Sequence, residues 1–134
     1  MDLRREFNLS PEDEKFLGEY GLLWETIAEG AQRWVLLHSF PTHPGYNHPT
    51  ATIAVRLETG YPRAELNMVY VFPALSRSDG QPIGQVNATQ ALDGKTFQRW
   101  SRHRTPEGPW VAGVDNLESH VMLVEEWLVR EFEK

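Results

Sequence analysis

The sequence predicts an α+β fold made of an N-terminal helix, a four-stranded antiparallel meander, a long irregular segment and a C-terminal helix. Two patterns carry this prediction. Apolar and polar side chains alternate in two runs within residues 50–75, which is typical of strands buried on one face. Near the C-terminus, apolar side chains recur every three or four residues, which is typical of a helix packed on one side.

Residues 1–9 are predicted to form a short N-terminal arm that leads into the first helix. Ser10 can cap that helix and Pro11 suits its first position, and the acidic residues that follow complement the positive end of the helix dipole. Gly18 and Gly21 bound the end of the helix, which is therefore short.

Two strands are predicted next, over residues 22–27 and 33–38, joined by a turn. A loop rich in Pro, Gly and His follows at residues 39–50 and leads to the central pair of strands. Four consecutive strands with short connections favour an antiparallel meander.

The central pair is the clearest strand signal in the chain. Gly60 and Pro62 mark the connection between its two strands, and Pro73 ends the second one because proline cannot serve a central ladder. Each strand is predicted to present one apolar face, formed by Ile53, Val55 and Leu57 in the first and by Leu66, Met68, Tyr70 and Phe72 in the second.

Residues 76–114 show no persistent periodicity and are expected to form a long irregular segment, a feature that is commonly functional. The final helix is predicted to begin at a capping box with Asp115 at the cap and Glu118 at the third position. Its apolar stripe consists of Leu117, Val121, Val124 and Leu128.

Composition narrows the classes of function. A length of 134 residues favours one domain, predicted over residues 10–134. The absence of cysteine excludes disulfides, thiolate metal sites and a cysteine nucleophile. A net charge of −6 argues against a general nucleic-acid binder. No apolar run approaches the roughly 20 residues that cross a bilayer, and no secretory signal is visible, so we expect no membrane partner and a cytoplasmic location.

Known site motifs are mostly missing. His38, His43 and His48 are spaced by five residues, which gives no fixed metal geometry, so we expect packed turn residues and no metal. Neither phosphate-binding glycine motif occurs, and no cofactor is expected. Ser101 and His103 could form part of a hydrolase site, but no nucleophile elbow accompanies them.

The strongest local signal is a basic and aromatic stretch at residues 97–104. Its basic side chains could grip phosphate or an acidic protein surface, or they could belong to a solvated loop anchored by tryptophans. In either case Trp100 and Trp110 are expected to be buried, with the arginine heads outside. The predicted partner-binding residues are Arg99, Trp100, Arg102, Arg104 and Trp110.

The order of elements and several strings resemble the ubiquitin-conjugating enzyme superfamily, and within it a bacterial branch found beside ubiquitin-like proteins and their activating enzymes. The resemblance spans roughly residues 10–130 and rests on four matches. These are HPGYNH at 43–48, GYPRAELNMVYVFPAL at 60–75, FQRWSRH at 97–103 and W-x-x-G-x-D-x-L-x-x-H at 110–120.

The resemblance implies a ubiquitin-conjugating-enzyme-like fold, with a ubiquitin-like protein and its activating enzyme as partners. Conjugating enzymes carry the modifier on a cysteine, which this chain lacks, and the equivalent region falls near Ser101 to His103. A cysteine-free scaffold or pseudoenzyme is therefore the leading hypothesis. The alternatives are a transferase that uses Ser101 or His103 as an unusual acyl carrier, and a plain interaction module of the same fold.

Overall fold

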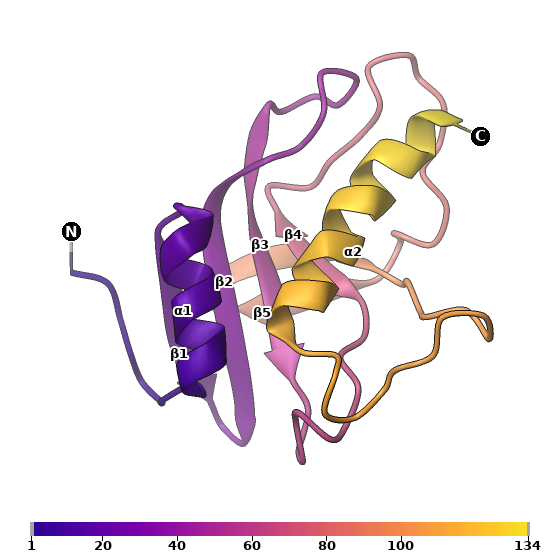
Figure 1. The fold of residues 1–134 in the computed structure, drawn as a ribbon. Helices are drawn as coiled ribbons and strands as arrows, with labels where there is room; N and C mark the ends of the chain where they lie inside the picture. The colour runs from indigo at the N-terminus through magenta and orange to yellow at the C-terminus, as the bar shows by residue number, and fades with distance from the viewer. Residues whose placement is uncertain (1, 134) are drawn as a thin grey trace.

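A computed structural model describes residues 2–133, so Met1 and Lys134, the ends of the predicted arm and domain, lie outside the described residues. Two helices lie side by side on one face of a curled antiparallel sheet (Figure 1). The elements in order are α1 (Pro11–Tyr20), β1 (Trp24–Glu29), β2 (Gln32–Pro41), β3 (Thr50–Leu57), β4 (Val69–Phe72), β5 (Thr89–Leu92), β6 (Lys95–Trp100), α2 (Leu117–Arg130) and a final 3₁₀ turn, η1 (Glu131–Glu133).

The sheet has six strands in the order β1-β2-β3-β4-β6-β5, and every neighbouring pair is antiparallel. The first four strands form the predicted meander. The prediction that residues 76–114 are irregular was wrong, because β5 and β6 form a hairpin within them. Its turn contains Asp93 and Gly94, both with positive φ, and an Asp-Gly pair is a strong hairpin signal.

The predicted apolar face of the second central strand holds for Met68, Tyr70 and Phe72, which pack on the same side of the sheet, but was wrong for Leu66. Met68 has a φ of 63° and lies outside β4, so the alternation breaks there. Leu66 consequently packs with the helices, whereas Tyr70 packs on the opposite face of the sheet.

The main core lies between the sheet and the helices. The predicted stripe of α2 is buried in it, together with Leu17 of α1 and the fully buried Trp100 of β6. A smaller apolar cluster covers the opposite face of the sheet, where the curl brings β5 and β6 over the first strands. Its buried members are Ile27, Trp34, Leu36, Ala54, Tyr70, Leu92 and Phe97.

The predicted N-terminal cap is confirmed for α1 and was wrong for α2. The Ser10 side chain accepts the backbone N–H of Asp13 at the start of α1, as predicted. The cap of α2 is Asn116, not Asp115, and it forms a reciprocal capping box with Ser119. Asp115 is diverted because its carboxylate accepts the Val111 N–H. Neither helix in the described range has the length and apolar character needed to cross a membrane.

Arg4 joins the two ends of the curled sheet. Backbone hydrogen bonds run between Arg4 and Glu6 of the N-terminal arm and Thr26 of β1. The Arg4 side chain donates to Glu25 of β1 at 2.8 Å and to Asp93 in the β5–β6 turn at 2.7 Å. The arm is thus bound to the domain. The Arg4 guanidinium forms a clasp between β1, at one edge of the sheet, and the turn after β5, at the other edge.

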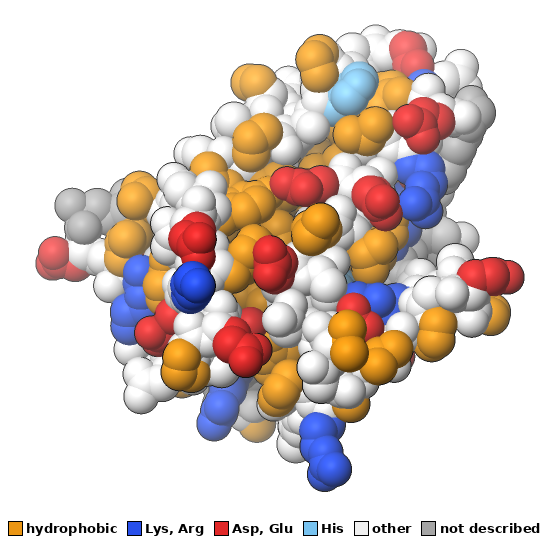
Figure 2. Space-filling model, in the orientation of Figure 1, with side chains coloured by type: hydrophobic (Ala, Val, Ile, Leu, Met, Phe, Trp, Pro, Cys, Tyr) orange, Lys and Arg blue, Asp and Glu red, His pale blue; other side chains and the backbone are white. Residues whose placement is uncertain are grey.

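Charge is distributed unevenly over the surface. Acidic side chains gather on the face formed by α1 and α2, with apolar side chains between them (Figure 2). Most of the arginines elsewhere are paired with carboxylates, including Arg4, Arg77, Arg102 and Arg104.

Candidate functional site

The residues predicted to be functional lie at the end of β6, which contains Arg99 and Trp100, and in the segment that links β6 to α2. Arg102 fixes its start, because its guanidinium donates to the Glu131 carboxylate at 2.9 Å and to the Gly84 carbonyl at 3.0 Å. The Arg102 side chain is 14% exposed and that of Glu131 is 3% exposed, so this ion pair is largely shielded from water. The Met68 N–H also donates to the Arg102 carbonyl, which ties the segment to the start of β4.

Arg104 fixes the next part of the segment. Its guanidinium lies 3.5 Å from the Asp115 carboxylate and 4.9 Å from the centre of the Trp110 ring. The Trp110 indole N–H donates to the Pro62 carbonyl, which connects the segment to the β3–β4 link. Two further nitrogen atoms of Arg104, Nε and Nη2, are buried without a hydrogen-bond partner in the described structure. Arg104 therefore serves as an internal support.

The expectation that these arginines remain outside was wrong. Acidic residues distant in sequence pair with Arg102 and Arg104, and tryptophan rings lie beside both guanidinium groups. Arg99 is half-buried, with a buried Nε that has no partner in the described part of the chain. Trp100 is fully buried, as expected, and so has no surface with which to contact a partner.

Ser101 and His103 lie just after β6, in the segment that leads to α2, but they are not arranged as a catalytic pair. The Ser101 backbone N–H donates to the Gln85 carbonyl, and the His103 side chain is exposed. Within residues 2–133, neither the Ser101 hydroxyl nor the His103 ring makes a hydrogen bond. A serine nucleophile requires a base within hydrogen-bond reach, and that geometry is missing here.

His120 is a buried polar residue that the sequence analysis did not single out as a site. Its Nε2 donates to the Met68 carbonyl at 2.8 Å, and its Nδ1 is buried without a partner in the described structure. Burial lowers the pKa of His120 to about 4, with a smaller contribution from the charge of Arg104. Its place beside Val121 on the apolar stripe of α2 was the signal that could have predicted its burial.

The three spaced histidines do not converge. The His38 ring contacts Glu25 and Thr52, whereas the His43 ring accepts the Gly45 N–H and stacks on Phe132. Among the described residues, no group of three or more His, Asp or Glu side chains is arranged to hold a metal ion.

A comparison with protein families identifies the family of this chain. The family described as prokaryotic E2 family E matches residues 9–131, which is nearly the whole chain. The chain belongs to this family. Comparison with curated proteins and with solved structures found no match. The bacterial E2-like relationship is thus shown by the family match, and the α+β architecture is consistent with it.

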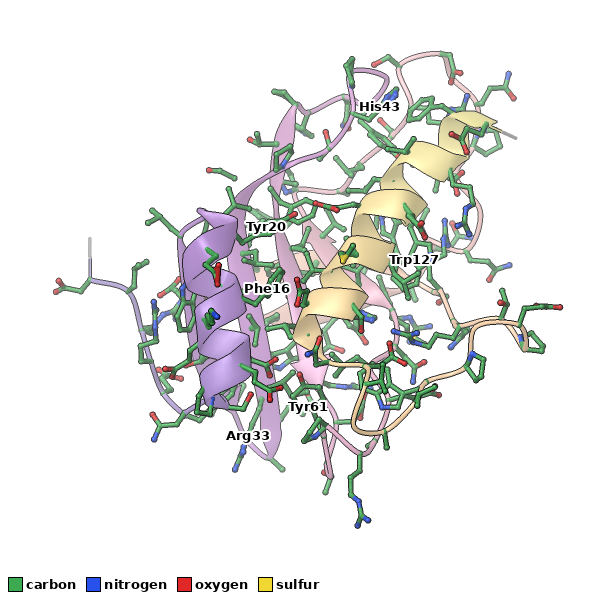
Figure 3. All side chains as sticks on the ribbon, in the orientation of Figure 1. Phe16, Tyr20, Arg33, His43, Tyr61 and Trp127 are labelled. Carbon is green, nitrogen blue, oxygen red and sulfur yellow. The ribbon has the colours of Figure 1, made fainter. Side chains whose placement is uncertain are left out.

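In this family E chain, the Tyr-Pro pair lies at the junction of the two helices. Tyr61 lies between the lower ends of α1 and α2 (Figure 3). Its hydroxyl donates to the Asp13 carboxylate of α1 at 2.6 Å and accepts the Leu117 N–H of α2 at 2.8 Å. Burial raises the pKa of both Tyr61 and Asp13, which keeps the phenol protonated as a donor.

The accessible part of the candidate site is apolar rather than basic. Val114 is 71% exposed and Val111 48% exposed, and both lie between Trp110 and the start of α2. His103 and Pro62 are exposed near the same segment. This E2-like chain therefore combines an internally supported loop with a small apolar surface, and it contains no cysteine.

Proposed function

We propose that this chain is a cysteine-free scaffold, or pseudoenzyme, of a bacterial ubiquitin-like modification pathway, and that it binds the modifier or its activating enzyme. The family relationship supports the E2-like part of this proposal. The scaffold role, the pathway and the partners are inferred from the chemistry of the segment between β6 and α2.

The observation that carries the proposal is a supported loop without an activated nucleophile. Arg102 and Arg104 hold the loop through shielded ion pairs, yet Ser101 and His103 lack any hydrogen bond between them. Acyl transfer needs a nucleophile with a lowered pKa or an oriented base. Protein binding needs only a positioned surface, and loops on a rigid scaffold commonly supply one.

We infer that the partner contacts His103, Val111 and Val114, whereas the predicted arginines act indirectly. Exposed apolar side chains of this kind form the centre of many small interfaces. Arg102, Arg104 and Trp110 would then position the loop, since their side chains are occupied within the molecule.

The test is incubation with the activating enzyme, the modifier and ATP from a genome that encodes this chain. We expect a non-covalent complex with one of the two proteins and no hydroxylamine-labile adduct. Val114→Asp should weaken that complex, whereas Leu23→Asp, which changes a similarly exposed apolar residue elsewhere, should not. An adduct that is lost in Ser101→Ala or His103→Ala would establish a transferase instead. Failure to bind either protein would favour a plain interaction module.

A further inference from the structure

An apolar groove lies between α1 and α2 on the outer face of the molecule. Tyr20 and Phe16 of α1 lie on the side of the helix that faces α2 (Figure 3), and their rings are 5.2 Å apart. The Tyr20 hydroxyl donates across the groove to Glu125 of α2. In one hollow of the groove Phe16 lies among charged and polar side chains, and in another Tyr20 and Leu128 form an apolar floor.

The exposed side of α2 extends this apolar surface. Met122 is 56% exposed and Val129 is 43% exposed. They are two helical turns apart and therefore lie on the same face. Glu125 and Glu126 lie between them in sequence and line the same shallow hollow. This face of α2 thus presents two exposed apolar side chains with carboxylates between them.

The charged side chains around the groove are mostly acidic. In the described structure, its exposed basic side chains are Lys15 and Arg130, and Arg130 already lies 3.4 Å from Glu126. The exposed carboxylates of α1, α2 and η1 are Glu12, Glu14, Glu19, Glu118, Glu125, Glu126 and Glu133.

We propose that this groove binds a basic linear segment of a partner protein, in which lysine or arginine residues flank one or two apolar side chains. The apolar residues would cover Met122, Val129 and the groove floor, and the basic residues would meet the carboxylates. Charge complementarity of this kind speeds encounter and selects partners. A second copy of the chain would bring the same acidic face and is therefore disfavoured by repulsion. The groove shares no residue with the surface of His103, Val111 and Val114.

The probe is a fluorescein-labelled peptide of about seven residues, with Lys and Arg flanking two Leu, because an extended chain of that length spans a helix of 14 residues. A control peptide has Glu in place of each basic residue. Binding is measured by fluorescence anisotropy at low and raised salt, and the contact surface is mapped by amide NMR shifts. We expect saturable binding of the basic peptide, with shifts confined to α1 and α2.

Charge reversal at the groove provides the decisive variant. Glu19→Lys/Glu126→Lys should weaken binding about tenfold, because two rim contacts become repulsive. The matched control, Glu65→Lys/Glu107→Lys, changes net charge equally at exposed sites outside the groove and should bind like the wild type. Met122→Ser should weaken binding without changing its salt dependence.

Three results would overturn the proposal. An equal loss of affinity in both double variants would show non-specific attraction, and an absence of saturable binding would remove the site. Sedimentation that shows a dimer, dissociated by Met122→Ser, would instead assign the surface to self-association. None of these results bears on binding at Val111 and Val114, so the two proposals can fail separately.

Discussion

The hydroxyl of Tyr61 lies 2.6 Å from the buried carboxylate of Asp13 and 2.8 Å from the backbone nitrogen of Leu117. One oxygen atom therefore links α1 to the first residue of α2. A helix start has backbone N–H groups without internal partners, so an acceptor at this position stabilises α2 directly. The same contact gives the buried Asp13 carboxylate a donor.

Tyr61→Phe removes this link while keeping the ring. We expect the free energy of unfolding to fall by about 1–3 kcal/mol, because a buried carboxylate and a helix N–H both lose their phenol partner. Urea denaturation monitored by circular dichroism measures the change. Tyr20→Phe is the control, since its hydroxyl bonds to Glu125 at the surface and its loss should cost less than about 1 kcal/mol. Equal effects would show that the Tyr61 hydroxyl has no special structural role.

Arg4→Met tests the clasp across the sheet. We expect the free energy of unfolding to fall by about 1–3 kcal/mol near pH 7, because Glu25 and Asp93 lose a shared partner. Arg56→Met breaks a more exposed pair with Glu58 and should change stability by less than about 1 kcal/mol.

The clasp should also depend on pH. Hydrogen bonding from Arg4 is the main reason that the pKa of Glu25 falls to about 2 from an ordinary value of 4.5. The stabilisation that the ionised Glu25 carboxylate contributes is therefore complete above pH 4.5 and is lost as the pH falls toward 2. The stability difference between wild type and Arg4→Met should shrink over that window. A difference that stays constant would contradict the assigned ion pair.

His120→Gln tests the buried histidine. In the folded protein His120 remains neutral down to about pH 4, whereas the ordinary value for an unfolded chain is 6.5. Its lowered pKa means that stability is highest above pH 6.5 and falls as the pH drops to about 4, by roughly 3 kcal/mol. Glutamine does not titrate, so the difference between the two stability curves isolates His120 from the other histidines. Parallel curves would show that His120 is not buried as the structure places it.

Gly45→Ala tests the loop between β2 and β3. A Cβ atom at Gly45 would lie 2.3 Å from the Phe132 ring. That ring stacks on His43 and lies under the guanidinium of Arg77, so it cannot move freely. Overpacking here should cost about 1–3 kcal/mol in the free energy of unfolding.

Two comparisons make the Gly45 result specific. Gly84→Ala places a Cβ in open space and should change stability by less than about 1 kcal/mol. Adding Phe132→Leu to Gly45→Ala should recover part of the loss, because the clashing ring atoms are removed. Purely additive losses would indicate that the two residues do not touch.

The regular elements were predictable where a periodic pattern was long enough. The stripe from Leu117 to Leu128 and the alternation in residues 51–57 are local patterns, and both appear in the structure. The β5–β6 hairpin was missed because each strand is short and β5 carries one buried residue, Leu92. Only its Asp-Gly turn held a local signal.

The sequence indicated a candidate segment, but it did not predict the environment of the side chains in that segment. Sequence identified the segment around Trp100 to Arg104, and burial of Trp100 followed from its size. The partner of Arg102 is Glu131, which is 29 residues away, and no local pattern connects the two. Whether an arginine faces water or an internal carboxylate depends on such distant pairings, and these become visible only in three dimensions.

The Arg4 clasp also bears on the kinetics of folding, since it joins positions that are 89 residues apart in the chain. Closing a loop between such distant positions costs entropy, and we expect this side-chain contact of the N-terminal arm to form after the rate-limiting step. An interaction absent from the transition state acts on the unfolding rate alone. We therefore expect Arg4→Met to accelerate unfolding and leave refolding nearly unchanged in stopped-flow measurements. In that case the clasp determines how long the folded molecule persists, rather than how quickly it forms.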